Sequence, residues 1–334
     1  MDWILGAGSV GQKFTVMVIA ILLFVVVMGV LLFGVDRLKR APTWTLVAAF
    51  LGPTLLFLTF GLLYPGIRTI YASLFDQTST EYVGFQNYVT AFTEPQFQIV
   101  LRNTMLWVLL VPIVSTMIGL VYAVLVDRTR FESLAKTLIF LPMAISLVGA
   151  SIIWKFVYQY KPHSFEPGAT NPNQIGLANQ ILVWLHIEPQ QFLLNQPTNT
   201  LYLIVVMIWI QCGFAMTVLS AAVKAIPDDI VEAARIDGLH GFGMFRFITV
   251  PSIRPALVVV LTTIAMGTLK VFDIVRTMTG GNFGTSVVAY EFYTQSFRAE
   301  NIGLGAALAV ILFVLVIPVV VYNVRQLRLA EEIR

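Results

Sequence analysis

The sequence predicts an all-α membrane protein, a polytopic bundle of about seven transmembrane helices. Hydrophobic residues make up 57% of the 334 residues and charged residues only 12%, about half of the charged fraction that soluble domains carry. Apolar stretches of about 20 residues, the length a helix needs to cross a bilayer, recur along the chain. Loops rich in lysine and arginine alternate with loops that are poor in them. These observations exclude an ordinary soluble protein.

Each predicted span is an apolar run bounded by polar loops. The first is longer than a signal-peptide core and precedes the basic segment 37–40 without a small-residue cleavage pattern, so we expect a permanent helix. The second and fourth contain Pro53 and Pro142, which membrane helices tolerate when neighbouring groups satisfy the freed carbonyls. We therefore expect about seven membrane-spanning helices, at roughly residues 14–35, 45–66, 104–126, 137–158, 200–223, 255–276 and 305–324.

The basic residues predict the orientation. They follow the first, third, fifth and seventh spans, whereas the long loops 67–103, 159–199 and 277–304 contain few of them. The positive-inside rule places the basic loops in the cytoplasm. We therefore expect the C-terminus and the 224–254 loop in the cytoplasm and, with an odd number of spans, the N-terminus outside. The net charge of +3 is concentrated in these loops and gives no support for nucleic-acid binding.

No residue constellation supports an enzyme or a metal site. Cys212 is the single cysteine, and His163, His186 and His240 lack the spacing of metal ligands. No Ser/His/Asp set and no paired intramembrane carboxylates occur. The GGNFGTS segment at 280–286 lacks the lysine of a phosphate-binding loop. We therefore expect no cofactor or metal in this chain.

One outer loop is expected to contain a short helix. Apolar residues recur at helical spacing between Gln174 and Leu185, after a segment rich in proline and asparagine. We interpret 174–185 as a helix at the outer membrane interface. A lid over the helix bundle remains an alternative.

The polar loop after the fifth span is predicted to form a helix–turn–helix elbow. Pro227 stops the preceding helix, and Asp228 and Asp229 are suited to be the N-cap and first-turn acids of a new helix. Gly238 is suited to end that helix in a left-handed conformation. A second short helix is expected at about 241–249.

Two interpretations of this elbow are open from the pattern alone. Ala233 and Ala234 are small enough to let the surface of a partner approach closely, which favours a docking element. The alternative is an amphipathic loop that lies under the lipid headgroups.

At this point the chain resembles a known family. Glu232-Ala233-Ala234, three residues, Gly238, nine residues, Ile248, one residue and Val250-Pro251 follow the EAA motif of ABC importer permeases, with valine in place of the usual leucine. The segments KAIPDDIVEAARIDG at 224–238, VGFQNY at 83–88 and IFLPMAIS at 139–146 are similar to the maltose-type carbohydrate permeases. The segment VFDIVRTMTGGNFGT at 271–285 resembles the alpha-glucoside and glucosylglycerol branch. The resemblance covers nearly all of residues 45–334.

This resemblance implies an architecture and a set of partners. Residues 1–44 would be an additional N-terminal transmembrane helix with a cytoplasmic turn, and 45–334 would be a six-helix ABC type I importer core with the coupling loop at 224–255. The partners would be a second permease subunit, two ABC ATPase subunits and an extracytoplasmic solute-binding protein. The substrate would be a sugar. ATP and Mg would bind to the partner ATPase. The chain itself would lie in a bacterial inner membrane, in contact with its lipids.

The resemblance also assigns roles in the elbow. The helix would insert into a cleft of the ATPase, with Glu232 paired to a basic group and Gly238 permitting the turn. The coupling residues would be Glu232, Ala233, Ala234, Asp237 and Gly238.

Candidates for the solute path come from two sources. Polar and aromatic residues at membrane depth are functional candidates, and here they are Trp209, Gln211, Phe214, Thr263, Gly267, Lys270 and Asp273. The resemblance adds Met143, Leu147, Met207, Ile210 and Met266. Several of these are apolar where the maltose permease is polar, so either this subunit or its partner permease would hold the sugar.

Lys270 and Asp273 are three residues apart in the predicted sixth helix. On one helix they would share a face, continued by Arg276. Three roles are therefore open for them. They could form an ion pair, Lys270 could extend to the outer interface, or they could contact the sugar directly.

Two other functions compete with a sugar importer. An ATP-independent secondary transporter is disfavoured because one acid alone lies near membrane depth and no broken-helix pair is apparent. An ABC importer of another polar solute, such as a polyol phosphate, would use the same subunits and differ only in the solute.

Overall fold

The computed structural model describes residues 10–37, 43–127, 129–162 and 174–332. Within these ranges the chain is helical, and the one pairing of extended backbone is an isolated bridge between Phe75 and Tyr82. Five of the described helices are long and apolar enough to cross a membrane, or seven spans result if each of two bent pairs counts as one. The predicted all-α polytopic bundle is confirmed.

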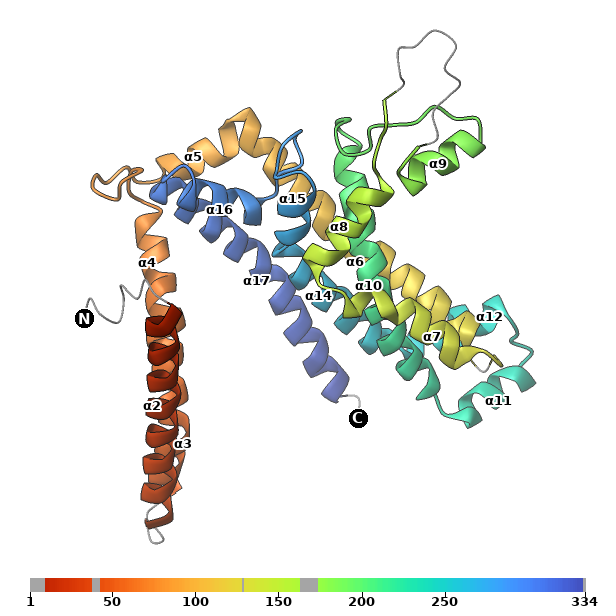
Figure 1. Cartoon of the computed structure of the whole chain (residues 1–334). Helices are drawn as coiled ribbons and strands as arrows, with labels where there is room; N and C mark the ends of the chain where they lie inside the picture. The colour runs from red at the N-terminus through yellow and green to blue at the C-terminus, as the bar shows by residue number, and fades with distance from the viewer. Residues whose placement is uncertain (1–9, 38–42, 128, 163–173, 333–334) are drawn as a thin grey trace. The chain divides into compact units, whose positions relative to one another are not determined.

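The chain forms two compact units, Met1–Arg68 and Thr69–Arg334. The first contains α2 (Val10–Arg37) and α3 (Thr43–Leu58), which lie side by side (Figure 1). A π-helical turn (Thr59–Leu63) connects α3 to α4 (Tyr64–Ala72), which runs into the second unit. The first two predicted spans are therefore helical. The division predicted at residue 44 separates the first span from the rest and stays a prediction.

The second unit is built around α10 (Asn199–Lys224), which packs along α6 (Pro95–Val126). A Cβ atom on Gly119 of α6 would lie 2.6 Å from the Ala215 Cβ and 2.7 Å from the Met216 nitrogen. The two backbones therefore touch at Gly119, because no side chain separates them. Glycine is required at this crossing because a larger side chain would collide with α10, and not because of its backbone conformation.

Further helices surround this pair (Figure 1). They are α5 (Gln86–Thr93), α14 (Arg254–Leu269), α16 (Val288–Phe297) and α17 (Ile302–Glu332). α14 packs on α6 and α17, and α16 packs on α17. Buried apolar residues around Trp107, Leu203 and Ile264 form the main core.

The fourth predicted span is not one continuous helix, and the structure corrects the prediction in that respect. The chain forms α7 (Glu132–Phe140), a 3-10 turn (Leu141–Ala144) and α8 (Leu147–Val157), and the two parts are bent by 102°. Pro142 is the second residue of the tight turn, and the Ser146 side chain accepts a hydrogen bond from the Gly149 N–H at 3.1 Å as the N-cap of α8. A new capped helix therefore starts within the predicted span.

The sixth predicted span also differs. α14 ends at Leu269, and a separate helix, α15 (Asp273–Met278), follows after a break. At its N-terminal end α14 is bent by 71° from the helical segment Phe242–Ser252. The argument that the chain lacks broken-helix pairs is therefore wrong. The helix expected at 174–185 is present as α9 (Leu177–Trp184), and its place at the outer interface stays a prediction.

Candidate functional site

The polar loop after α10 folds into the predicted elbow. α11 (Asp228–Ile236) follows α10 after a three-residue turn that ends in Pro227. Pro227, and not Asp228, occupies the N-cap position with extended backbone, and no side chain caps the helix. Asp228 and Asp229 lie in the first turn and Arg235 in the last, where each charge is favoured by the helix dipole.

The end of α11 is a Schellman motif around Gly238. The Leu239 N–H donates to the Ala234 oxygen at 2.9 Å, and the Gly238 N–H donates to the Arg235 oxygen at 3.0 Å. Gly238 has φ +84°, the left-handed conformation that the sequence predicted.

The second arm of the elbow starts at another glycine. Gly241 has φ 51° and ψ −119°, which fits the first central position of a type II′ turn. The Gly243 N–H closes this turn on the His240 oxygen at 3.0 Å. The arm then comprises α12 (Phe242–Met244), a π-helical turn (Phe245–Thr249) and α13 (Val250–Ser252). It is therefore longer than the expected 241–249.

The two alanines of the motif face in different directions. Ala234 is buried against its own chain, whereas Ala233 is exposed. A partner can therefore approach Ala233 closely, whereas the chain itself covers Ala234. Glu232, Asp237 and Gly238 are exposed.

Apolar side chains also project from the elbow. Ile236 is 86% exposed, Phe242 72% and Phe247 62%. Large exposed apolar groups that cluster beside charges are typical of protein–protein contacts. The exposure of Ile236 and Phe247 was not predicted, because their positions in the sequence do not reveal which side of the elbow they face.

An ion network holds the base of the elbow. The Lys224 Nζ at the end of α10 lies 2.5 Å from Glu132 Oε1 and 3.9 Å from Asp127 Oδ1. Glu132 Oε1 also accepts from Lys136 Nζ, one turn further along α7. We call these four residues, Asp127, Glu132, Lys136 and Lys224, the clasp. The acidic members were not predicted as functional.

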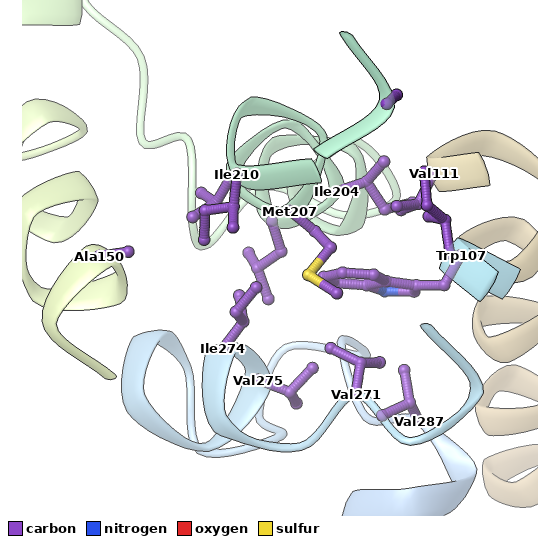
Figure 2. Close-up of a cluster of buried hydrophobic side chains, with 14 of the residues drawn as sticks. Trp107, Val111, Ala150, Ile204, Met207, Ile210, Val271, Ile274, Val275 and Val287 are labelled. Atoms are coloured by element: carbon purple, nitrogen blue, oxygen red, sulfur yellow. The ribbon is translucent and has the colours of Figure 1, made fainter. Parts of the chain in front are cut away.

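The solute-path candidates divide by burial. Met207 and Ile210 are 3% and 5% exposed and lie in the core with Trp107 and Ile274 (Figure 2). Their side chains pack against this subunit, so they face no open path in this structure.

Two other candidates come together between α10 and α14. Gln211 is half-buried, and a Cβ atom on Gly267 would lie 3.9 Å from its Nε2. Thr263 is exposed one turn earlier on α14. In the described part of the chain, no hydrogen bond to protein engages the Gln211 amide or the Thr263 hydroxyl. These groups are therefore available to hydroxyl groups of a ligand.

The remaining candidates are spread over the subunit. Trp209 is half-buried and meets Trp154 of α8 edge to face at 5.7 Å between ring centroids. Met143 is 41% exposed in the turn between α7 and α8. Phe214, Leu147 and Met266 are half-buried.

Lys270 and Asp273 do not share a helical face, because α14 ends between them. Lys270 is the exposed C-cap of α14, and Asp273 lies in the first turn of α15. No ion pair joins them in the described structure. Arg276 instead stacks on Phe272 and Tyr293, with its Cζ 5.4 Å and 5.0 Å from the ring centroids.

Comparisons with known proteins identify the family. Residues 89–328 match the model of the binding-protein-dependent transport system inner membrane component. The chain is 48% identical over 285 residues to the osmoprotective compounds uptake permease protein GgtC of Synechocystis sp., covering 85% of this chain and 100% of that protein. It is 44% identical over 278 residues to the alpha-glucoside transport system permease protein AglF of Rhizobium meliloti, covering 83% and 81%.

A solved structure has the same fold. A chain of a bacterial alginate ABC transporter, crystallised in complex with an alginate pentasaccharide-bound periplasmic protein, superposes with a TM-score of 0.70. That chain is 23% identical, and the match covers 86% of this chain and 94% of the other. Family membership excludes the secondary transporter considered above. The chain therefore belongs to the binding-protein-dependent transport system inner membrane components: it is a multi-pass, non-catalytic permease subunit of an ABC importer, whose ATPase is a separate subunit.

Proposed function

We propose that this subunit carries an α-glucoside-type solute, either a sugar or a glucosylated osmoprotectant such as glucosylglycerol, into the cell. The observation that carries the proposal is the identity of 48% and 44% to permeases named for osmoprotective compounds and alpha-glucosides, the first matched over its whole length. An importer of a polyol phosphate would need cationic groups for the phosphate beside the solute, and Lys270, at the end of α14, is the one cation among the path candidates. Gln211 and Thr263, whose side chains make no hydrogen bond to protein within the described residues, are uncharged and favour a neutral polyhydroxylated solute.

The complex that we propose contains a second permease subunit, two ABC ATPase subunits that bind ATP and Mg, and a periplasmic solute-binding protein. The elbow and the C-terminus would lie in the cytoplasm and the N-terminus outside, as the basic loops indicate.

The elbow would be the ATPase docking element. Its exposed face combines Glu232 with the apolar Ile236 and Phe242, and Gly238 and Gly241 fix its two arms by their backbone conformations. Closure of the ATPases on ATP would move α11 and shift the helices between inward-facing and outward-facing states. Each ligand must bind one of those states more tightly than the other for this shift to occur.

The solute would pass beside α10 and α14. Gln211 offers a donor and an acceptor, Thr263 offers a hydroxyl, and Gly267 leaves open space next to Gln211. Lys270 lies at the outer end of α14, where it is exposed and within reach of an entering solute.

The test is uptake by the complete complex reconstituted in liposomes. A panel of labelled sucrose, trehalose, maltose, glucosylglycerol and glycerol 3-phosphate would be offered with ATP inside. We expect a glucoside to be imported and glycerol 3-phosphate to be excluded. Import of the phosphate ester alone would contradict the proposal.

A coupling variant completes the test. Glu232→Lys reverses the charge that the elbow offers to the ATPase, so we expect ATP-driven uptake to be lost at matched membrane levels. Arg235→Gln, on the last turn of the same helix, is the control for a general effect of altered charge.

A further inference from the structure

The clasp joins three helices at the base of the elbow. Glu132 begins α7, Asp127 is the C-cap of α6, and Lys224 is the last residue of α10. Glu132 is the centre of the clasp, because its Oε1 contacts both Lys224 and Lys136. Its side chain is 20% exposed, so water screens these contacts less than those of a fully exposed pair.

A second contact fixes the other end of α7 to the same helix. A Cβ atom on Gly213 of α10 would lie 2.6 Å from the Ile139 oxygen and 3.1 Å from the Phe140 Cα. The backbones of α7 and α10 therefore touch at Gly213. α7 runs antiparallel to the last turns of α10 and is held to it at Ile139 by packing and at Glu132 by charge.

The two ends of this helix pair lead to the two functional regions. Three residues after Lys224, the chain enters α11, the proposed docking helix. At the opposite end of α7, the chain enters the 102° bend at Leu141–Ser146, which contains the solute-path candidate Met143. The chain of contacts from α11 through α10 and α7 therefore leads to Met143.

We propose that the clasp makes α7 and the cytoplasmic end of α10 one rigid arm, and that Glu132 is the positioning residue that holds this arm together. The arm delivers the movement of the docking helix to the bend at Leu141–Ser146. This inference rests on the proposed role of the elbow in ATP coupling. Glu132 would touch neither the solute nor the ATPase, and it would act through Lys224.

The chain offers a matched pair of variants for the test. Lys224→Gln breaks the contact between α7 and α10. Lys136→Gln removes the other lysine of Glu132 but leaves that contact in place, because both Lys136 and Glu132 belong to α7. Neither change unfolds the chain, since partly exposed ion pairs contribute little to stability.

The measurement is the amount of labelled glucoside imported per ATP hydrolysed by the reconstituted complex with its binding protein. We expect Lys224→Gln and Glu132→Gln each to lower this ratio about two- to five-fold, the range that one partly exposed ion pair supports. The double variant should be no worse than either single variant, because both remove the same contact. Lys136→Gln should keep the wild-type ratio.

A cross-linking experiment distinguishes a rigid arm from a contact that opens during transport. Cysteines replace Glu132 and Lys224 in a Cys212→Ser background, and a short thiol-to-thiol cross-linker joins them. Transport that survives cross-linking supports the rigid arm. Loss of transport on cross-linking would overturn the inference, as would equal defects in Lys136→Gln and Lys224→Gln or a normal ratio in Lys224→Gln.

The experiments distinguish a failure of this inference from a failure of the proposed function. If the wild-type complex imports none of the solutes tested, the proposed substrate class fails. The stimulation of ATP hydrolysis by the binding protein then replaces the import ratio, and the same comparison of Lys224→Gln with Lys136→Gln decides the inference.

Discussion

The left-handed residue at the end of the docking helix gives the sharpest test of the elbow. Gly238 has φ +84°, and a Cβ atom placed there meets no heavy atom within 4 Å. Space is therefore available for a side chain, and the backbone conformation alone requires glycine. The two hydrogen bonds that close α11, from Leu239 and Gly238, depend on this conformation.

The expected effect follows from the cost of that conformation. A left-handed backbone costs an L-residue about 1–2 kcal/mol, and asparagine tolerates it better than other side chains. A cost of 1–2 kcal/mol shifts the equilibrium between the closed and the frayed last turn by about 5- to 30-fold. Gly238→Val should therefore lower coupling strongly, whereas Gly238→Asn should keep most of it.

The assay is ATP hydrolysis stimulated by the binding protein, measured together with glucoside uptake at matched membrane levels. Gly243→Ala is the control on the same elbow, because its Cβ would lie at an ordinary 3.5 Å from the Leu239 Cδ2. We expect this variant to resemble the wild type. Equal activity of the valine and asparagine variants would refute the reasoning, and so would a defect in Gly243→Ala as large as that of Gly238→Val.

Three further outcomes are expected. A cysteine at His240 in a Cys212→Ser background should react with an impermeant thiol reagent only after permeabilisation, and labelling in intact cells would reverse the orientation. Gln211→Ala and Thr263→Val should each weaken the apparent affinity for the solute by up to about tenfold, because one hydrogen bond contributes about 0.5–1.5 kcal/mol; unchanged concentration dependence in both would assign the solute site to the partner permease. Gly213→Val should destabilise the α7–α10 contact by about 1–3 kcal/mol and lower the thermal stability of the purified complex, because its Cβ would lie 2.6 Å from a backbone oxygen.

The elbow could be predicted from the sequence because its signals are local. Pro227, the acids that follow it and Gly238 each act on the backbone within one or two residues, and the structure places a helix end at each position where they predict one. The N-cap was assigned to Asp228 in place of Pro227, since the acids suggested a side-chain cap that the structure does not contain.

The breaks in the fourth and sixth spans were missed for a physical reason. Hydropathy averaged over about 20 residues responds to composition, and both breaks lie within apolar surroundings. The fourth span did contain a signal for its break. Pro142 disfavours continuation of the helix, and Ser146 is suited to be the N-cap of a new one. In the sixth span, Lys270 took the C-cap position, so its predicted shared face with Asp273 disappeared.

Burial on α10 could not be predicted from its sequence. The helix is apolar on nearly all sides, so periodicity does not separate residues that face a solute path from residues that face the core. Met207 and Ile210 proved to be core residues, whereas Gln211 is only half-buried. The contact between Glu132 and Lys224 joins distant parts of the chain and leaves no local pattern to detect.

The bend between α7 and α8 has a consequence for how the protein enters the membrane. The two helices contain 9 and 11 residues, about 14 Å and 17 Å at helical rise, and neither reaches across a hydrocarbon core of about 30 Å. The backbone contact that seats α7 is made by Gly213, which the ribosome adds long after Ile139. We therefore expect the position of the α7–α8 segment in the bilayer to become fixed only after α10 has been synthesised. Truncated nascent chains that end before residue 199 should show mixed exposure of the α7–α8 region, and chains that extend beyond residue 224 should show a single one.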